Sequence, residues 1–153
     1  MGQIQIRFSL ITCLCSILLS CASTNPFSVP EGSGGILKNS YEYKDGKYYG
    51  YCFKAIDGVH LDHGWIAPER EAYYIAPAGL RKLVVKIVYA PNGIGAFKPI
   101  YNIWAMIETK IDKESVYYTK CDYRSDNIEI WIDNGTGKIK SDIVNAYEIF
   151  RVH

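Results

Sequence analysis

The residues of this chain that best suit metal chemistry lie in the segment VHLDHGW, residues 59–65. His60 and His63 supply the imidazole nitrogens that zinc prefers. Two residues three apart point to opposite sides of a strand, so they could share a metal only in a loop. The nearby carboxylates that could complete such a site are those of Asp62, Glu69 and Glu71. A metal-binding protein or metal-dependent enzyme that uses this loop is one hypothesis, and an ordinary polar loop is the other.

Other catalytic signatures are absent from the sequence. It contains neither the GxSxG elbow of a serine hydrolase nor the HExxH motif of a zinc protease. The segment NGTGK, residues 134–138, matches a phosphate-binding loop only in part, because Ile139 follows the lysine where Ser or Thr is needed. Cys52 and Cys121 do not form a CxxC redox motif. We therefore predict a protein that is not an enzyme and that needs no cofactor.

The chain is unusually rich in tyrosine, with 13 tyrosines in 153 residues. Five of them fall in YEYKDGKYYGY, residues 41–51. A small core cannot enclose all five rings, and exposed tyrosine is enriched where proteins meet their partners. We predict a binding surface at Tyr41, Tyr43, Tyr48 and Tyr49. The alternative is an aromatic-rich strand whose outer rings cover neighbouring backbone.

The elements that must position these residues begin with an export signal. Arg7 lies in a short polar start, an apolar run extends from Phe8 to Leu19, and small residues follow. This layout is typical of a secretory signal, and the run is too short to span a bilayer as a helix. Position 6 holds Ile6, not the Ser or Thr that myristoylation requires. We expect a signal peptide over residues 1–20.

The signal ends in LLSC, residues 18–21, which resembles the lipobox of bacterial lipoproteins. In that pattern an aliphatic residue, a tolerant position and a small residue precede an invariant cysteine. The resemblance implies that Cys21 receives diacylglycerol, that the chain is cut before it, and that its new amine is acylated. Such acyl chains anchor a protein to the membrane at about 0.8 kcal/mol per buried CH₂ group. The alternative is a secreted protein that is cut near Ala22.

The residues after the cysteine indicate where the protein goes and how far the domain reaches. Ala22 and Ser23 stand where Asp would favour the inner membrane, so the resemblance implies the periplasmic face of the bacterial outer membrane. The inner membrane and the cell surface are the alternatives. Small and polar residues up to Gly35 predict a flexible tether. We expect the acylated cysteine and tether over residues 21–40 and the folded domain over residues 41–153.

Loss of the signal peptide changes both the charge and the cysteine count. The full chain has 17 basic and 16 acidic residues, and removal of Arg7 leaves equal numbers. A neutral protein has no electrostatic attraction to phosphate backbones, so we expect no nucleic-acid partner. Cys52 and Cys121 remain besides the lipidated cysteine. A pair in an oxidising compartment predicts a disulfide, worth about 4 kcal/mol on the chain-entropy model, with two buried thiols as the alternative.

The rest of the chain alternates apolar and polar residues with a period of two, which predicts β-strands. Strands are expected at residues 47–56, 71–76, 80–90, 104–112, 116–124 and 128–133. Residues 137–150 could form a short helix or a last strand. The predicted inward sets include Leu83, Val85, Ile87 and Tyr89; Ala105, Ile107, Thr109 and Ile111; Tyr117, Thr119, Cys121 and Tyr123; and Ile128, Ile130 and Ile132. We predict an all-β fold, an antiparallel β-sandwich, with a small open β-barrel as the alternative.

A second resemblance covers residues 74–138. The segments IAPAGLRKLVVKI and IEIWIDNGTGK are similar to parts of small bacterial lipoproteins of uncharacterised role that carry a sandwich domain. Those proteins often have His in the pair after the first Gly, whereas this chain has Leu80 and Arg81. The matching motifs are a turn before a long strand and a strand before a glycine turn. The resemblance therefore implies a fold and no catalytic residue.

These observations together predict a lipid-anchored envelope lipoprotein. Its sandwich domain would be a non-catalytic binding or structural module that faces the periplasm. The expected contacts are the membrane, through acyl chains on Cys21, and an envelope protein or glycan. The alternatives are the metal site at His60 and His63, and a small-ligand carrier with an apolar pocket between its sheets.

Overall fold

The computed structural model describes residues 26–61, 72–95, 100–124, 127–145 and 149–152. These residues form strands, turns and loops. No helix among them is long and apolar enough to cross a membrane.

Strands make up most of the described chain. In order they are β1 (Gly34–Lys38), β2 (Ser40–Lys44), β3 (Lys47–Ile56), β4 (Val59–His60), β5 (Tyr73–Pro77), β6 (Gly79–Ala90), β7 (Ile100–Ile111), β8 (Val116–Arg124), β9 (Asn127–Asp133), β10 (Val144–Asn145) and β11 (Ile149–Val152). The predicted strand at residues 47–56 is β3, and the one at 116–124 is β8. Residues 137–150 contain β10 and the start of β11, so the strand alternative is the correct one in the described part of that segment.

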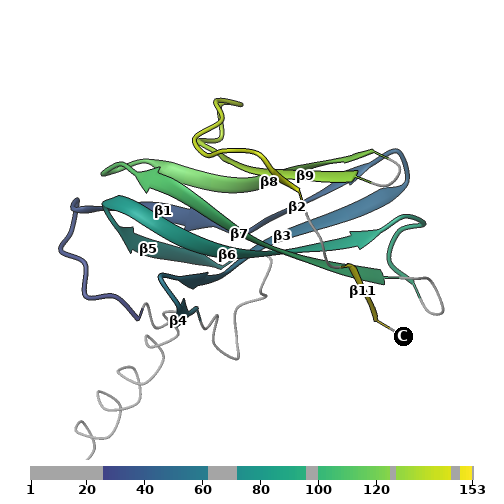
Figure 1. Ribbon diagram of the computed structural model, residues 1–153, viewed down its shortest axis with the longest axis horizontal. Helices are drawn as coiled ribbons and strands as arrows, with labels where there is room; N and C mark the ends of the chain where they lie inside the picture. Colours follow the sequence, from purple (N-terminus) through teal and green to yellow (C-terminus); the bar gives the residue numbers. More distant parts are fainter. Residues whose placement is uncertain (1–25, 62–71, 96–99, 125–126, 146–148, 153) are drawn as a thin grey trace, which may run out of the picture.

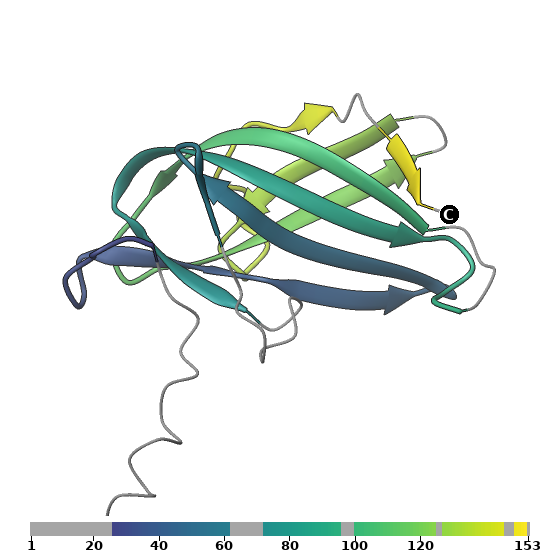
Figure 2. The same ribbon diagram turned by 90° about the horizontal axis from the view of Figure 1, so that it is seen from below.

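The strands form two sheets that pack against each other, as Figures 1 and 2 show. One sheet has the order β10-β9-β8-β1-β5, and the other has the order β11-β7-β6-β3-β2 with β4 added to β3. Neither sheet closes on itself, so the predicted β-sandwich is confirmed and the barrel alternative is wrong. Neighbouring described strands pair antiparallel except β1 and β8, which are parallel where Ile36 and Leu37 meet Val116 and Tyr117.

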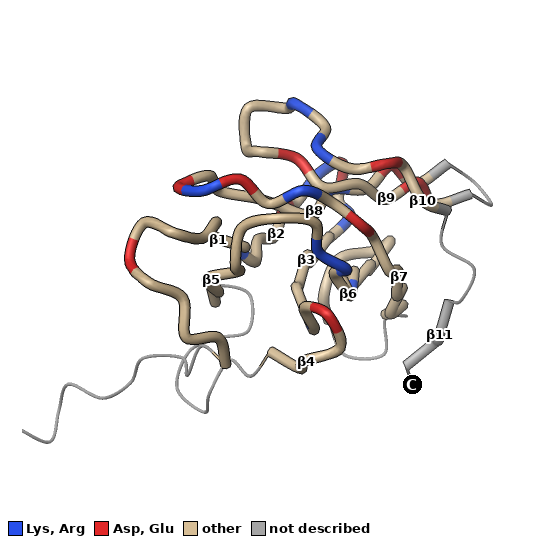
Figure 3. The backbone as a smooth tube through the Cα atoms, turned by 60° about the vertical axis from the view of Figure 1, so that its left-hand side comes forward, with Lys and Arg blue, Asp and Glu red and all other residues tan. Residues whose placement is uncertain are grey.

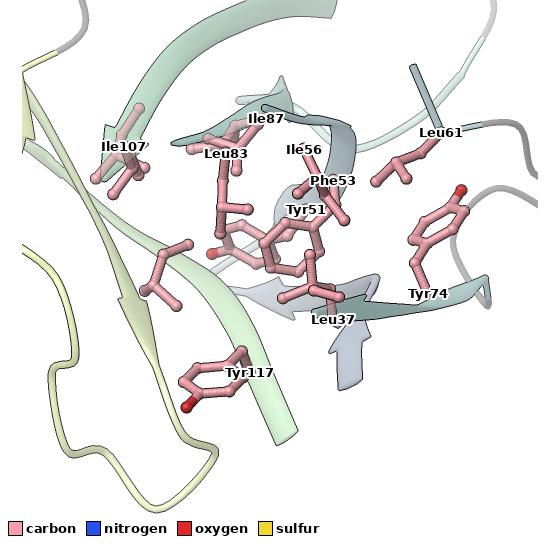
Figure 4. Close-up of a cluster of buried hydrophobic side chains, with 14 of the residues drawn as sticks. Leu37, Tyr51, Phe53, Ile56, Leu61, Tyr74, Leu83, Ile87, Ile107 and Tyr117 are labelled. Carbon is pink, nitrogen blue, oxygen red and sulfur yellow. The ribbon is translucent and has the colours of Figure 1, made fainter. Parts of the chain in front are cut away.

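The core lies between the two sheets, and Figure 4 shows its central side chains. Leu83, Val85 and Ile87 of β6 are completely buried, whereas Lys82, on the opposite face of the same strand, is exposed. The predicted inward sets of β7, β8 and β9 line the same interior. The period of two therefore identified the inward faces correctly, because each sheet has one wet face and one buried face.

The fold begins earlier in the chain than the predicted boundary at residue 41. Phe27 packs against the core, and β1 lies within the segment predicted as tether. Gly35 permits close packing here, because a Cβ on it would lie 2.6 Å from Ile111 Cγ2 and 2.9 Å from the carbonyl oxygen of Asp112. The glycine that suggested flexibility is therefore a site of close approach between strands.

A single extended segment crosses from one sheet to the other at Asn39. Before it, β1 pairs with β5 and β8; after it, β2 pairs with β3. The Asn39 side chain is buried, and its Oδ1 accepts a 2.8 Å hydrogen bond from the backbone N–H of Phe53, next to a bulge in β3. As a result, β1 pairs with β8 only as far as Tyr117. Among the described residues, no strand pairs with this edge of β8 from Tyr118 onward.

Candidate functional site

Two of the predicted sites lie wholly or partly outside the described residues. Cys21 falls in residues 1–25, and His63 falls in residues 62–71 with the carboxylates proposed to join it. His60 ends β4, and its side chain is exposed. Among the described residues, no group of three His, Cys, Asp or Glu side chains could hold a metal ion. The metal site at His60 and His63 stays a prediction.

The predicted disulfide between Cys52 and Cys121 is absent, because both residues are thiols in the structure. Cys52 alternates in β3 with Tyr51 and Phe53, which are part of the core, so its side chain lies on the outer face of that sheet. Cys121 lies on the inner face of β8, where its thiol donates to Tyr51 Oη at 3.9 Å. The two sulfur atoms are thus on opposite sides of the β3 sheet, where a disulfide cannot join them.

The predicted tyrosine surface lies partly on the outer face of the β2–β3 hairpin. Tyr41 and Tyr43 on β2 are 49% and 63% exposed. Tyr48 on β3 contacts both, with ring centroids 6.4 Å from Tyr41 and 5.1 Å from Tyr43. The Tyr48 ring covers Gly50, since a Cβ there would lie 3.2 Å from Tyr48 Oη. We call Tyr41, Tyr43 and Tyr48 the tyrosine face.

Tyr49 does not belong to this face, although one binding surface was predicted for all four tyrosines. It alternates with Tyr48 and points between the sheets, where it stacks on Tyr51 with ring centroids 6.4 Å apart. Tyr89 links it to Tyr123, at 5.1 Å and 4.5 Å respectively. Burial raises the pKa of Tyr49 to about 12 and also raises the pKa of Tyr51 and of Tyr89. The phenol groups of Tyr49, Tyr51 and Tyr89 are therefore neutral at ordinary pH.

Glu42 links the edge of β2 to the open edge of β8. Tyr51 Oη donates a 2.7 Å hydrogen bond to Glu42 Oε1, and Lys120 Nζ lies 3.7 Å from Glu42 Oε2. The same ammonium lies 5.5 Å from the centre of the Tyr51 ring. Burial raises the pKa of the Cys121 thiol to about 11, although its hydrogen bond to Tyr51 lowers it. Because a thiol is a poor nucleophile when protonated, this contact has a structural role.

A polar cavity of about 200 Å³ opens beside this link, between the tip of the β2–β3 hairpin and the end of β8. Its lining includes Lys44, Lys47 and Tyr49 from the hairpin, and Cys121, Asp122 and Tyr123 from β8. The lining atoms are mainly polar, so this cavity is not the apolar pocket of the predicted small-ligand carrier. Figure 3 shows that basic and acidic residues are interspersed along the backbone.

The sequence reasoning missed the hairpin that builds this cavity. Asp45 and Gly46 form its turn with φ angles of 51° and 74°. An Asp-Gly pair between alternating residues is a recognised signal for such a turn, and it is present in YKDGKY. The pair would have placed Lys44 opposite Lys47, which is their register in the structure.

Two further exposed apolar residues share the outer face of the β3 sheet. Trp104 and Met106 on β7 are 39% and 65% exposed. Trp104 pairs with Lys86, which in turn pairs with Cys52, so all three side chains lie on the same side of the sheet as the tyrosine face. The outer face of the β3 sheet therefore exposes aromatic or apolar groups both at the tyrosine face and at Trp104 and Met106.

Comparison with known proteins assigns no family to this chain. No protein-family model matches it, and no solved structure matches it. The function must therefore be argued from the side chains described above and from the sequence before residue 26.

Proposed function

We propose that this protein is a lipid-anchored component of the bacterial cell envelope whose sandwich domain is a non-catalytic binding module. Acyl chains on Cys21 would hold it at the outer membrane, with the domain in the periplasm. The apolar run at residues 8–19 and the LLSC segment at residues 18–21 support this anchor. The fold supports the proposed binding module, since Tyr41 and Tyr43 form an exposed aromatic surface.

Few residues separate the proposed anchor from the fold. Phe27 already packs against the core, so residues 22–26 are the only ones between it and Cys21. A flexible coil of that length spans about 12 Å, compared with about 20 Å for a tether that extends to Gly35. The proposed module would therefore work close to the membrane surface.

The tyrosine face is the observation that carries the binding role. Its two outer rings are exposed, yet both contact Tyr48 and Tyr48 is held over Gly50. Tyrosines contribute large contact areas at little conformational cost, and they are enriched among the residues that dominate binding energies. An envelope protein or a glycan could bind these rings at little cost in conformational entropy, because the rings are already held in position.

Site-specific crosslinking in the native cell tests this role. A photoreactive phenylalanine analogue at position 43 should give a discrete adduct, and Tyr41→Ser should reduce its yield at least 10-fold. The matched control is the same analogue at Tyr73, which is 56% exposed on β5 in the other sheet. A discrete adduct at position 73 but not at 43, or no adduct at either, would contradict the proposal.

A further inference from the structure

The sheet that contains β5 has an apolar patch on its outer face, where β5, β1 and β8 pair. Ile75, Ile36 and Val116 stand side by side in one row across these three strands. Paired residues have their side chains on the same side of a sheet, so this row lies on the opposite side from the completely buried Leu37. Ile75 is 36% exposed, and Tyr73, two residues earlier on the same side, is 56% exposed. We call Tyr73, Ile75, Ile36 and Val116 the β5 patch.

The described N-terminal segment contacts this patch. Gly34 lies two residues before Ile36 and therefore faces the same side of the sheet. A Cβ on Gly34 would be 2.9 Å from Val29 Cγ1 and 3.0 Å from Ile75 Cγ2, so both side chains lie over this glycine. Figure 1 shows the segment before β1 at the end of the sheet where β1 and β5 meet. The chain that leads from the proposed lipid anchor therefore enters the fold at the β5 patch.

The proposed anchor keeps this part of the domain close to the bilayer. Phe27, which packs against the core, is six residues after Cys21. Even a fully extended chain of that length spans only about 21 Å. The tyrosine face lies on the outer face of the other sheet, and the two sheets of a sandwich pack about 10 Å apart. The β5 patch is therefore the apolar surface that the anchor brings to the lipid first.

The composition of the patch suits a lipid surface. Aliphatic side chains gain from leaving water at the boundary of the acyl chains, and tyrosine is enriched at that boundary. Lys38 pairs with Tyr73 and is exposed, and a lysine at such a rim can extend its ammonium group to the headgroups. Glu114, whose backbone N–H donates to Gly34 O at 2.8 Å, is exposed near the other end. These two charges balance each other, so apolar burial must supply the binding.

We propose that the β5 patch rests on the surface of the bilayer that holds the acyl chains. This inference rests on the proposed function, because the lipid on Cys21 keeps the patch at the membrane. It adds an orientation to that function: the sheet of β5 faces the lipid, and the sheet of β3 faces away from it. The tyrosine face then points into the periplasm, where a partner can reach it.

Methyl NMR of the acylated protein in lipid nanodiscs tests this orientation. The discs consist of phosphatidylcholine, which has no net charge, with a small fraction of lipid that carries a nitroxide on its headgroup. The nitroxide speeds the relaxation of nearby methyl groups. The methyl signals of Ile75 and Val116 should show at least 10-fold more enhancement than that of Met106. Met106 is the internal control, since it is 65% exposed on the outer face of the other sheet.

The variant Tyr73→Thr/Ile75→Thr removes the two most exposed side chains of the patch and keeps residues that favour strands. It should reduce the enhancement at Val116 at least 3-fold. The matched control is Tyr41→Thr/Tyr43→Thr, which makes similar changes on the tyrosine face and should leave the enhancement at Val116 unchanged. Circular dichroism checks that both variants are folded.

The outcomes separate this orientation from the anchor itself. A protein that does not elute with the discs has no lipid anchor, which would overturn both the proposed function and the orientation. A protein that elutes with the discs but shows equal enhancement at Ile75 and Met106, or more at Met106, keeps its anchor and overturns the orientation alone. The orientation is also overturned if the folded Tyr73→Thr/Ile75→Thr variant gives the same enhancement at Val116 as the parent.

Discussion

Asn39→Ala should destabilise the protein strongly for a single polar substitution. Asn39 lies where the chain crosses between the sheets, and it is only 2% exposed. Its Oδ1 atom accepts the backbone N–H of Phe53 at 2.8 Å, beside the bulge where β3 shifts its register with β6. The alanine side chain has no acceptor, and the N–H group of Phe53 would stay buried away from water.

The size of the effect follows from that unsatisfied group. A buried donor that loses its acceptor costs about 1–3 kcal/mol, and the small void left by the amide adds to it. We expect a loss of about 2 kcal/mol in the free energy of unfolding. With a urea m-value of about 2 kcal/mol/M, the unfolding midpoint should fall by about 1 M.

Urea unfolding followed by tryptophan fluorescence measures this change. The control is Asn134→Ala, which removes the same amide from an exposed turn where it accepts from Thr136 Oγ1 at 2.7 Å. Water can replace that partner, so the control should lose less than about 0.5 kcal/mol. Equal, small losses in the two variants would refute the view that the buried contact at Asn39 secures the crossing.

Three other predictions concern Tyr51, Tyr49 and the two cysteines. Tyr51→Phe should lower the free energy of unfolding by about 1.5 kcal/mol in urea titrations, because it removes the donor to Glu42; a change below about 0.5 kcal/mol would count against this bond. The folded-state pKa of Tyr49, about 12, exceeds its unfolded value of 10.0, so its stabilisation is complete below pH 10 and is lost as the pH rises towards 12. Urea midpoints measured from pH 8 to 11.5 should fall above pH 10 and fall less in Tyr49→Phe, whereas a flat profile would contradict the burial. Cys52 and Cys121 should each take up one alkyl group in urea without reductant, and resistance to alkylation until reduction would show a disulfide.

The sequence predicted the inward-facing side chains correctly wherever one face of a strand is buried and the other is exposed to water. Leu83, Val85 and Ile87 show this in β6, where the alternation alone identified the inward face. It was a poor guide at β1, because Gly34 and Gly35 looked like linker residues. Their small size instead allows neighbouring strands to approach closely, which depends on contacts far apart in the chain.

The candidate sites could be predicted only where local pattern was enough. Tyr41 and Tyr43 were correctly predicted to be exposed, since they share one side of a short segment. Whether Cys52 and Cys121 face each other depends on how two sheets are stacked, and no local pattern records that. The polar cavity likewise follows from the crossing at Asn39, which joins β1 and β2 to different sheets.

The intact mass of the protein, extracted in detergent from its native membrane, tests the central claim most directly. The account predicts a mass that equals residues 21–153 plus the acyl groups of a lipidated Cys21. Removal of ester-linked chains by mild base should then reduce that mass by whole fatty acids. An unmodified mass that begins at or after Ala22 would contradict the lipid anchor and would leave a free secreted domain.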